Sequence, residues 1–442
     1  MTQLTRPRKG PLRARNPIGP SLAFLGLVLT VTGCLTGTAA GSGFVYDPGF
    51  GTGERGVGRI FEKGFIREMI PRRDGGITFV GKSRSDNPET LKNTFFAGVL
   101  KANGTPLYSF GKLGRAENPL PSVWGNAAGI ARAPGGKFYV VGNFREESSS
   151  WKSLVYRIHT DGWVDDAFHT YTSNASSTSR QILSDIATDG KGRAIVIGTY
   201  RQNHRTSRIL LMRFESGGKL DPDFGRGGRV VIGSRNKRNN RGITVIPLSS
   251  GRILFGGVLG GYPFVARIDE DGELDRRFGR HGITTFARGP ENKCGPRALC
   301  NLTDLVRTPD GNIRALANFD YYMDSWIPSV IGLRPGGRID SRFGEGGWLN
   351  LGDWGAGSFG GRDLAAMDDS SVIVVSNHLA GNAAWSQVMR INPRGRFDRS
   401  FGNRGALRIN GTRAYGATAM ANGGFAIAFA RGQKALIQKF NP

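Results

Sequence analysis

The sequence predicts an all-β protein folded as a seven-bladed β-propeller, and three observations lead to this prediction. A short phrase, clearest as KLDPDFGRGGR at Lys219–Arg229, recurs every 54–65 residues, a period typical of propellers and other repeat architectures. Glycine accounts for 67 of the 442 residues and lies in turns between short apolar runs. The array starts at a copy of the phrase and stops after an apolar run, at Asn441-Pro442. This arrangement favours a closed ring over an open solenoid, which would need atypical capping units.

Each copy of the phrase contains an aromatic anchor, which we expect to be buried between neighbouring blades. The anchors are Phe50, Phe110, Phe168, Phe224, Phe278, Phe343 and Phe401. An Asp before the anchor can accept backbone N–H bonds in the turn, and the Gly after it permits positive φ. The Asp residues are Asp165, Asp221, Asp275, Asp340 and Asp398. Two copies differ: Tyr108 and Ser109 precede Phe110 without an Asp, and His169 replaces the Gly.

One unit divides into four short strands separated by turn residues. In the unit Arg229–Gly272 these are Arg229–Ile232, Gly242–Leu248, Arg252–Val258 and Phe264–Ile268. In this interpretation the phrase is the crossover from the fourth strand of one blade to the first strand of the next. Residues 43–442 then form seven blades of four strands and about 57 residues each, longer than the common propeller repeats.

The phrase and its lead-in resemble a known repeat family. The pattern Leu-Asp-x-x-Phe-Gly-x-x-Gly follows Arg-apolar-x-x-Asp-Gly, as at Arg157–Gly162 and Arg267–Gly272. It is similar to the delta-60 repeat family, found mostly in bacterial secreted or surface proteins, and covers nearly all of residues 43–442. The resemblance implies a β-propeller-like fold and no particular activity.

The N-terminus has the features of an export signal. A basic segment precedes the apolar run Ser21–Val31, whose 11 residues are too few to span a bilayer. Val31–Cys34 resembles a bacterial lipobox, which implies that residues 1–33 are a lipoprotein-type signal peptide and that Cys34 is lipidated. A secretory signal cleaved after Ala40 and an uncleaved anchor are the alternatives. Residues 34–42 would form a flexible tether, and the protein would be a membrane-anchored lipoprotein facing the periplasm or cell surface.

The chain is strongly basic, with a formal net charge of +25. Such a field favours anionic partners, namely nucleic acid, lipid headgroups or acidic polysaccharide, although a charged surface that only confers solubility explains it equally well. Five cations occupy one equivalent position of the repeat, at Arg157, Arg213, Arg267, Arg390 and Lys439. They could line an anion channel or pair with the phrase Asp residues. Because Arg and Asp recur together, pairing is favoured.

The sequence predicts no catalytic residue, cofactor or metal site. Gly51–Gly56 matches a dinucleotide-binding GxGxxG only by letters, without its strand–helix context. The five histidines are scattered over different units, and Asp269, Asp271 and Asp275 lack the Glu that closes a calcium loop. Cys294 and Cys300 lie in one insertion and can form a disulfide in an exported protein, free thiols being the alternative.

The connections on one face of the ring vary in length and content, whereas those on the other face are Gly-rich turns and the phrase. Function concentrates on variable loops held by a rigid scaffold. Candidate ligand-binding residues on the variable face are Arg201, Arg205, Arg208, Arg235, Lys237, Arg238, Arg241, Trp326, Trp354 and Trp385. Aromatic and basic side chains together suit acidic glycans, and suit single-stranded nucleic acid less well.

These features predict a non-catalytic module that binds an anionic cell-envelope polysaccharide. The alternatives are an envelope enzyme, acting on glycans with groups in the channel or loops, and a structural surface protein. Perturbed carboxylate pairs that converge on the channel would favour the enzyme.

Overall fold

The structure is a computed structural model. The chain divides into two units, Met1–Gly37 and Thr38–Pro442, and every described residue belongs to the second. The described residues are 45–51, 57–61, 64–84, 93–117, 124–145, 150–174, 179–202, 206–233, 239–287, 294, 300–320, 326–352, 358–380 and 383–442. The predicted signal peptide, Cys34 and the tether lie outside them.

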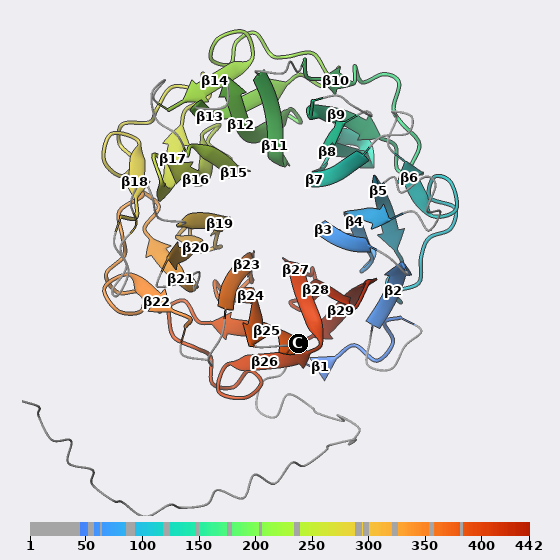
Figure 1. The fold of residues 1–442 in the computed structure, drawn as a ribbon, viewed down its shortest axis with the longest axis vertical. Helices are drawn as coiled ribbons and strands as arrows, with labels where there is room; N and C mark the ends of the chain where they lie inside the picture. The colour runs from blue at the N-terminus through green and yellow to red at the C-terminus, as the bar shows by residue number, and fades with distance from the viewer. Residues whose placement is uncertain are drawn as a thin grey trace, which may run out of the picture. The chain divides into compact units, whose positions relative to one another are not determined.

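Seven antiparallel sheets surround a central axis as the blades of a propeller, which confirms the predicted fold (Figure 1). In blades 1–4 the strands, from innermost to outermost, are β3 (Gly64–Pro71), β4 (Ile77–Arg84), β5 (Asn93–Leu100) and β6 (Arg115–Glu117); β7 (Trp124–Arg132), β8 (Phe138–Arg145), β9 (Lys152–Ile158) and β10 (Tyr171–Thr172); β11 (Ser179–Thr188), β12 (Ala194–Gln202), β13 (Thr206–Phe214) and β14 (Arg229–Ile232); and β15 (Arg241–Pro247), β16 (Ile253–Leu259), β17 (Tyr262–Ile268) and β18 (Ile283–Thr285).

In blades 5–7 the strands, again from the innermost, are β19 (Asn301–Arg307), β20 (Ile313–Asp320), β21 (Trp326–Leu333) and β22 (Trp348–Asn350); β23 (Ser358–Ala366), β24 (Val372–Ala380), β25 (Ala383–Ile391) and β26 (Ala406–Asn410); and β27 (Thr412–Ala419), β28 (Phe425–Arg431) and β29 (Lys434–Asn441), with β1 (Val45–Tyr46) and β2 (Val57–Phe61) at the outer edge. The only described helical segment in blade 2 is a 3₁₀ turn at Pro134–Gly136.

The predicted division of the repeat into blades is wrong by one strand. Arg229–Ile232 is not the first strand of a new blade but β14, the outermost strand of blade 3, where Val231 pairs with Leu210 of β13. The phrase therefore connects the third and outermost strands within a blade. The crossover between blades runs from β14 to β15. A repeating sequence shows the order of the strands but not which strand is the last of a sheet. The repeat length is the same wherever the boundary between two blades is placed.

The two ends of the described chain meet in blade 7. Val45 pairs with Asn441 and Tyr46 with Phe440, so the first strand extends the sheet of the last one. The Lys439 ammonium also forms an ion pair with Asp47 at 3.0 Å. The expectation of a closed ring, completed by the N-terminal copy of the phrase, is confirmed.

The anchors are buried between blades, as predicted, with exposed fractions of 0–2%. Phe224 belongs to a hydrophobic cluster that joins Ile197 of blade 3 to Phe255 of blade 4, and each of the other six anchors belongs to an equivalent cluster between neighbouring blades. The next residue, Gly225, has φ of 58° and donates its N–H to the carbonyl of Asp271 in the following blade at 2.7 Å. The phrase therefore fastens one blade to the next.

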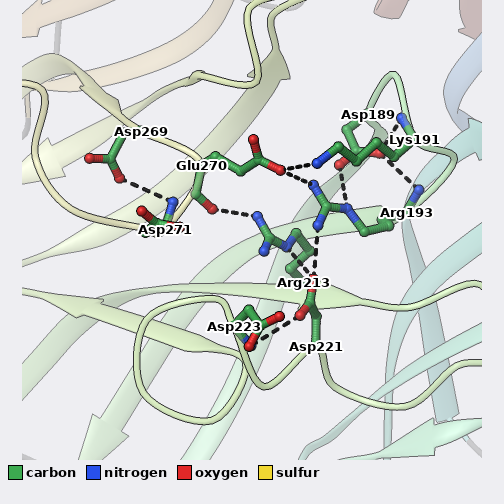
Figure 2. A network of polar contacts seen from close by, with 9 residues as sticks. All are labelled: Asp189, Lys191, Arg193, Arg213, Asp221, Asp223, Asp269, Glu270 and Asp271. Atoms are coloured by element: carbon green, nitrogen blue, oxygen red, sulfur yellow. Dashed lines mark hydrogen bonds and ion pairs between the residues drawn. The ribbon is translucent and has the colours of Figure 1, made fainter.

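Four of the recurrent cations, each on the third strand from the axis, pair with the phrase Asp residues, and Figure 2 shows one of these pairs, Arg213 with Asp221. Arg213 on β13, third from the axis, contacts Asp221 at 2.7 Å and lies 4.6 Å from the ring centroid of Phe224. Its guanidinium also donates to the carbonyl of Glu270 in blade 4. Arg193 joins this network through Asp221 at 3.0 Å and Glu270 at 3.3 Å. The pairing interpretation of these cations is confirmed, and the channel-lining alternative is wrong.

Two blades replace the pair in different ways. In blade 1 Val99 and Leu107 occupy the positions of Arg213 and Asp221, since the Leu107 N–H donates to Val99 as Asp221 donates to Arg213, both at 2.9 Å. Leu107, rather than Tyr108 or Ser109, therefore stands in place of the Asp. An apolar pair thus substitutes for the ion pair as a unit.

Blade 5 has Gly332 at the Arg position, and its cross-strand partner Arg314 supplies the missing guanidinium. Arg314 lies 4.5 Å from the centroid of Phe343 and donates to the carbonyl of Pro393 in blade 6 at 3.1 Å. Asp340 pairs with other arginines of its own turn. The contact between blades is kept although the residue that makes it has moved to the neighbouring strand.

Candidate functional site

Every innermost strand carries a β-bulge at the same register, and a bulge turns nearby side chains to new directions. The residues directly after the bulges are Glu68, Gly129, Asp185, Thr244, Asp304, Asp363 and Gly416. Four of these seven positions are acidic. Since the innermost strands surround the axis, the repeat brings four carboxyl groups to one level of the channel.

The four carboxyl groups, here called the carboxyl ring, each accept a backbone N–H from the next blade. The distances are 2.9 Å for Glu68 with Ile130, 2.9 Å for Asp185 with Val245, 2.8 Å for Asp304 with Leu364, and 2.7 Å for Asp363 with Ala417. Gly129 makes room for the longer Glu68 side chain, because a Cβ there would lie 2.9 Å from the Glu68 carboxyl oxygen. The carboxyl ring therefore has a structural role in holding blades together.

Asparagines on the second strands of three blades hold blades together in a similar way. The Asn143 amide bonds to both backbone groups of Leu183 in blade 3, at 2.7 and 2.8 Å. Asn318 bonds to Gly361 and Asn377 to Ala414 in the same two-bond manner. The junctions between blades 5 and 6 and between blades 6 and 7 contain both an asparagine of this kind and a member of the carboxyl ring, so they are held from the first and the second strand.

A cavity of about 390 Å³ lies inside the carboxyl ring. Its polar lining comes from six of the innermost strands and comprises Arg67, Glu68, Ser184, Asp185, Thr244, Thr303, Asp304, Arg307, Arg362, Asp363 and Tyr415. This size falls in the range of small-molecule sites, which run from about 300 to 1,000 Å³. The convergence of acidic, basic and hydroxyl groups in one hollow makes it a candidate ligand site.

Burial shifts the pKa of each carboxyl group upward. It raises the pKa of Asp185 to about 6. The pKa of Glu68 is raised well above its usual range by burial and then by the charges of Asp185 and Asp363. The pKa of Asp304 is raised by burial, by the charge of Asp363 and by a hydrogen bond between the two side chains. The pKa of Asp363 is raised by burial, although the same hydrogen bond acts to lower it. The interaction between the two groups therefore raises the pKa of Asp304 and lowers that of Asp363.

Three arginines, Arg67, Arg362 and Arg413, form what we call the channel arginine cluster. Arg67 and Arg362 are the bulge residues of β3 and β23, and all three side chains are exposed. Burial and the positive charges of Arg413 and Arg67 lower the pKa of Arg362. Within the described ranges none of the three forms an ion pair with a carboxylate. Tyr415 lies in the same wall and stacks on Phe65 with ring centroids 5.0 Å apart.

A second group, the loop arginine cluster, consists of Arg180, Arg201 and Arg241 on the variable face. Arg180 and Arg201 are cross-strand partners on β11 and β12, and Arg241 begins β15 of the next blade. The pKa of Arg201 is lowered by burial and by the charges of Arg180 and Arg241. No ion pair to a described carboxylate relieves this repulsion. The adjoining segments 203–205 and 234–238 contain no acidic residue and add Arg205, Arg235, Lys237 and Arg238.

The other predicted binding residues differ in whether the structure describes them and in how far they are exposed. Arg205, Arg235, Lys237, Arg238 and Trp354 lie outside the described residues. Trp326 is half-buried at the start of β21, and Arg208 is half-buried in β13. Trp385 is only 6% exposed, stacks on His378 at 4.8 Å and is covered by the Arg408 guanidinium at 4.0 Å. Its ring therefore offers no free stacking surface.

The predicted cysteine pair is bonded in the structure. Cys294 and Cys300 form a disulfide with their Cα atoms 5.8 Å apart, in the crossover from β18 to β19. The bond shortens the effective length of this insertion on the variable face.

The carboxyl ring was missed by the sequence reasoning, although a signal existed. The segments SDIA at Ser184–Ala187 and TDLV at Thr303–Val306 place an acid at the same point of an otherwise apolar strand, two units apart. RDLA at Arg362–Ala365 repeats it one unit later. An acidic residue that recurs at one offset inside a strand indicates a common partner. Arg180 was also missed, because only the ring brings it beside Arg241.

Two absences apply to the described part of the chain. It contains no group of three or more His, Cys, Asp and Glu side chains arranged to hold a metal ion. Among the same residues, no helix has the length and apolar character needed to cross a membrane.

Comparison with known proteins shows similarity of fold only. No family model matches the chain, and no curated protein does. The β-propeller domain of the Trilobed protease from Pyrococcus furiosus is 7% identical with a TM-score of 0.44, over 86% of this chain and 94% of that one. A protein of unknown function from Dyadobacter fermentans is 11% identical with a TM-score of 0.44, over 87% and 97%. A gluconolactonase from Xanthomonas campestris is 12% identical with a TM-score of 0.37, over 73% and 90%.

Proposed function

We propose that this propeller is an exported, lipid-anchored module that binds an anionic cell-envelope polysaccharide on its variable face without acting on it chemically. The observation that carries the proposal is the loop arginine cluster. Burial and the charges of Arg180 and Arg241 lower the pKa of Arg201, and no described carboxylate forms an ion pair with any of the three. Like charges held together in this way are stabilised by an anion, and guanidinium groups bind carboxylate, sulfate and phosphate groups bidentately.

The surroundings of the cluster support a polymeric ligand. Residues 235, 237 and 238 add further positive charge in the crossover that leads to Arg241, and Arg205 adds another in the neighbouring hairpin. A long polyanion can contact several such residues at once, and each contact releases counterions. The Cys294–Cys300 disulfide fits a protein that folds in an oxidising compartment, as export would require.

The test is binding to a panel of acidic polysaccharides, with uronate-rich, sulfated and phosphate-bearing chains, beside neutral glycans. Replacing Arg180, Arg201 and Arg241 by Gln should weaken binding by at least about tenfold and flatten its dependence on salt. The matched control replaces three exposed arginines of the opposite face, Arg226, Arg280 and Arg399. It removes the same charge from the other side of the ring. Equal losses in both variants, or no binding to any acidic chain, would overturn the proposal.

The location has its own test. Intact-mass analysis of protein extracted from membranes should find a mature N-terminus at Cys34 carrying a diacylglyceryl group. A mature N-terminus at Gly41, or an unmodified soluble form, would show that the lipobox resemblance misleads.

The hydrogen-bonded pair Asp304 and Asp363 favours a second candidate, an enzyme that acts on glycans with these groups as acid and base. Two features speak for the structural role instead. Both side chains accept backbone N–H bonds from the next blade, and a hydrogen-bonded pair is closer than the ~5 Å kept by retaining glycosidases. If the enzyme hypothesis holds, the wild type releases new reducing ends from an acidic glycan and Asp363→Asn does not. No release by the wild type from the whole panel excludes it.

A further inference from the structure

We propose that the central cavity is a second anion site, separate from the loop arginine cluster, which holds the carboxylate, sulfate or phosphate group of a small ligand against Arg67 and Arg362. Binding there takes up a proton on the carboxyl ring. This inference does not depend on the polysaccharide proposal, because it concerns different residues and a ligand small enough for a cavity of about 390 Å³.

The channel arginine cluster carries the proposal. Arg67 and Arg362 line the cavity from bulges of blades 1 and 6, and Arg413 of blade 7 lies close enough to Arg362 to lower its pKa. These side chains are exposed and form no ion pair with any carboxylate in the described ranges. By contrast, the recurrent arginines such as Arg213 are fully paired. The ring therefore contains two populations of arginine: the recurrent ones pair with Asp residues, whereas Arg67 and Arg362 line the cavity without an ion pair among the described residues.

The wall beside the cluster suits the organic part of such a ligand. Tyr415 presents its side chain to the cavity and is held flat by Phe65, with 20° between the two rings. Ser184, Thr244 and Thr303 add hydroxyl groups to the lining. A supported aromatic ring with several hydroxyl donors and acceptors matches a small polyhydroxylated acid better than a bare inorganic ion.

The proton uptake follows from what else faces the cavity. The charged and titratable groups that line the cavity are Arg67 and Glu68 on β3, Asp185 on β11, Asp304 and Arg307 on β19, Arg362 and Asp363 on β23, and Tyr415 on β27. Arg413 on β27 lies close enough to Arg362 to lower its pKa. The strands β7 and β15 contribute no titratable group to the lining. An incoming anion raises the pKa of nearby carboxyl groups, so each of them binds a proton more tightly when the site is filled.

The sign of the pH dependence is fixed by this linkage. Asp185 has a pKa of about 6 in the free protein, and an anion raises it further. Below about pH 6 the group is protonated in both states and affinity is constant. Above that value affinity falls as pH rises, by up to about tenfold per pH unit for one proton taken up.

The experiment is calorimetric titration of the folded protein with D-glucuronate and with glucose 6-phosphate, with glucose as the uncharged control, from pH 5 to pH 8. Two buffers of different ionisation enthalpy report proton uptake at pH 6.5. We expect one acidic sugar to bind and glucose not to bind, tighter binding at pH 5.5 than at pH 7.5, and net proton uptake. Preference for glucuronate or for the phosphate ester identifies the source of the anionic group.

Variants separate the site from the loops. Arg67→Gln and Arg362→Gln should each weaken binding about tenfold or more, whereas Arg399→Gln on the opposite face should not change it. Asp185→Asn keeps an oxygen to accept the Val245 N–H and should reduce the pH dependence while the protein stays folded by circular dichroism. If Arg362→Gln fails to fold, Arg413→Gln, which replaces an exposed side chain close to Arg362, should also weaken binding. Absence of binding at every pH, unchanged affinity in the arginine variants, or binding without proton uptake would each overturn the proposal.

Discussion

Replacing Asp221 by Leu should destabilise the ring more than replacing Asp221 and Arg213 together. Both side chains are buried, with exposed fractions of 5% and 1%. Removing Asp221 leaves the Arg213 guanidinium with only the Glu270 carbonyl and the face of Phe224. Loss of one partner of a buried ion pair costs about 3–5 kcal/mol, and we expect the lower end, about 3 kcal/mol, because those two contacts remain.

The reverse substitution is milder. In Arg213→Val the Asp221 carboxylate keeps Arg193 at 3.0 Å and the backbone N–H of Asp223 at 3.1 Å, so the cost should be about 1–2 kcal/mol. The double variant recreates the Val99 and Leu107 pair of blade 1 and should cost only about 1 kcal/mol. The two single losses then exceed the loss in the double variant by a pairwise coupling of about 3–4 kcal/mol.

Urea unfolding of the four proteins, followed by circular dichroism and tyrosine fluorescence, measures the cycle. Asp223→Leu is the matched control, because this exposed Asp lies on the same turn without facing Arg213, and it should change the free energy of unfolding by less than about 0.5 kcal/mol. Additive losses in the double variant would refute the claim that blade 1 shows a true exchange of an ion pair for an apolar pair.

Four further predictions concern the anchors, the two classes of carboxyl group and the disulfide. Phe224→Ala should cost about 3–5 kcal/mol in urea unfolding, since a large side chain is lost from a packed cluster between blades, and a loss below about 1 kcal/mol would contradict that position. Because the pKa values of the carboxyl ring are raised, the folded state binds more protons than the unfolded state between about pH 4 and 6. The stability that these groups contribute therefore falls as pH rises. Asp185→Asn should flatten the change in unfolding midpoint between pH 5 and pH 7. The phrase Asp residues have the opposite pH dependence. Burial acts to raise the pKa of Asp165, but its Lys137 and Arg157 partners outweigh burial and lower that pKa to about 2, so the stability that Asp165 contributes is lost as pH falls below about 4. The protein should therefore be most stable near pH 4–5. Cys294→Ser should lower the unfolding midpoint by the equivalent of about 2 kcal/mol if the short loop is closed in the native protein, and mass measurement with and without reductant checks the bond itself.

The features that could be predicted from the sequence are those whose residues recur together within a single repeat. Phe224 and its equivalents could be identified as plugs because a bulky apolar residue recurs inside a polar, Gly-rich turn. Arg213 and Asp221 could be paired because they recur together within one unit. In blade 5, Arg314 shows the limit of this approach: its role follows only from its cross-strand position opposite Gly332.

The features that were missed depend on geometry that one repeat does not contain. The direction of the Asp185 side chain is set by a β-bulge, and no residue type in the strand indicates where that bulge lies. Arg180 and Arg241 are distant in sequence and meet only when two blades are packed. The boundary between sheets was misplaced for a related reason, since Arg229–Ile232 can extend either the sheet before it or the sheet after it. The pairing of this segment with β13 places it in the sheet before it.

The bonds that link the first and second strands of neighbouring blades divide the ring into two arcs. Glu68, Asn143 and Asp185 link blades 1 to 4 in series, and Asp304 and Asp363, with their asparagines, link blades 5 to 7. Among the described residues, neither kind of link crosses from blade 4 to 5 or from blade 7 to 1. The first of these seams carries the disulfide crossover, and the second adjoins the blade where the chain ends meet. The cavity is lined by Arg67 on one arc and by Arg362 on the other, so an anion held by both would link the two arcs and oppose their separation.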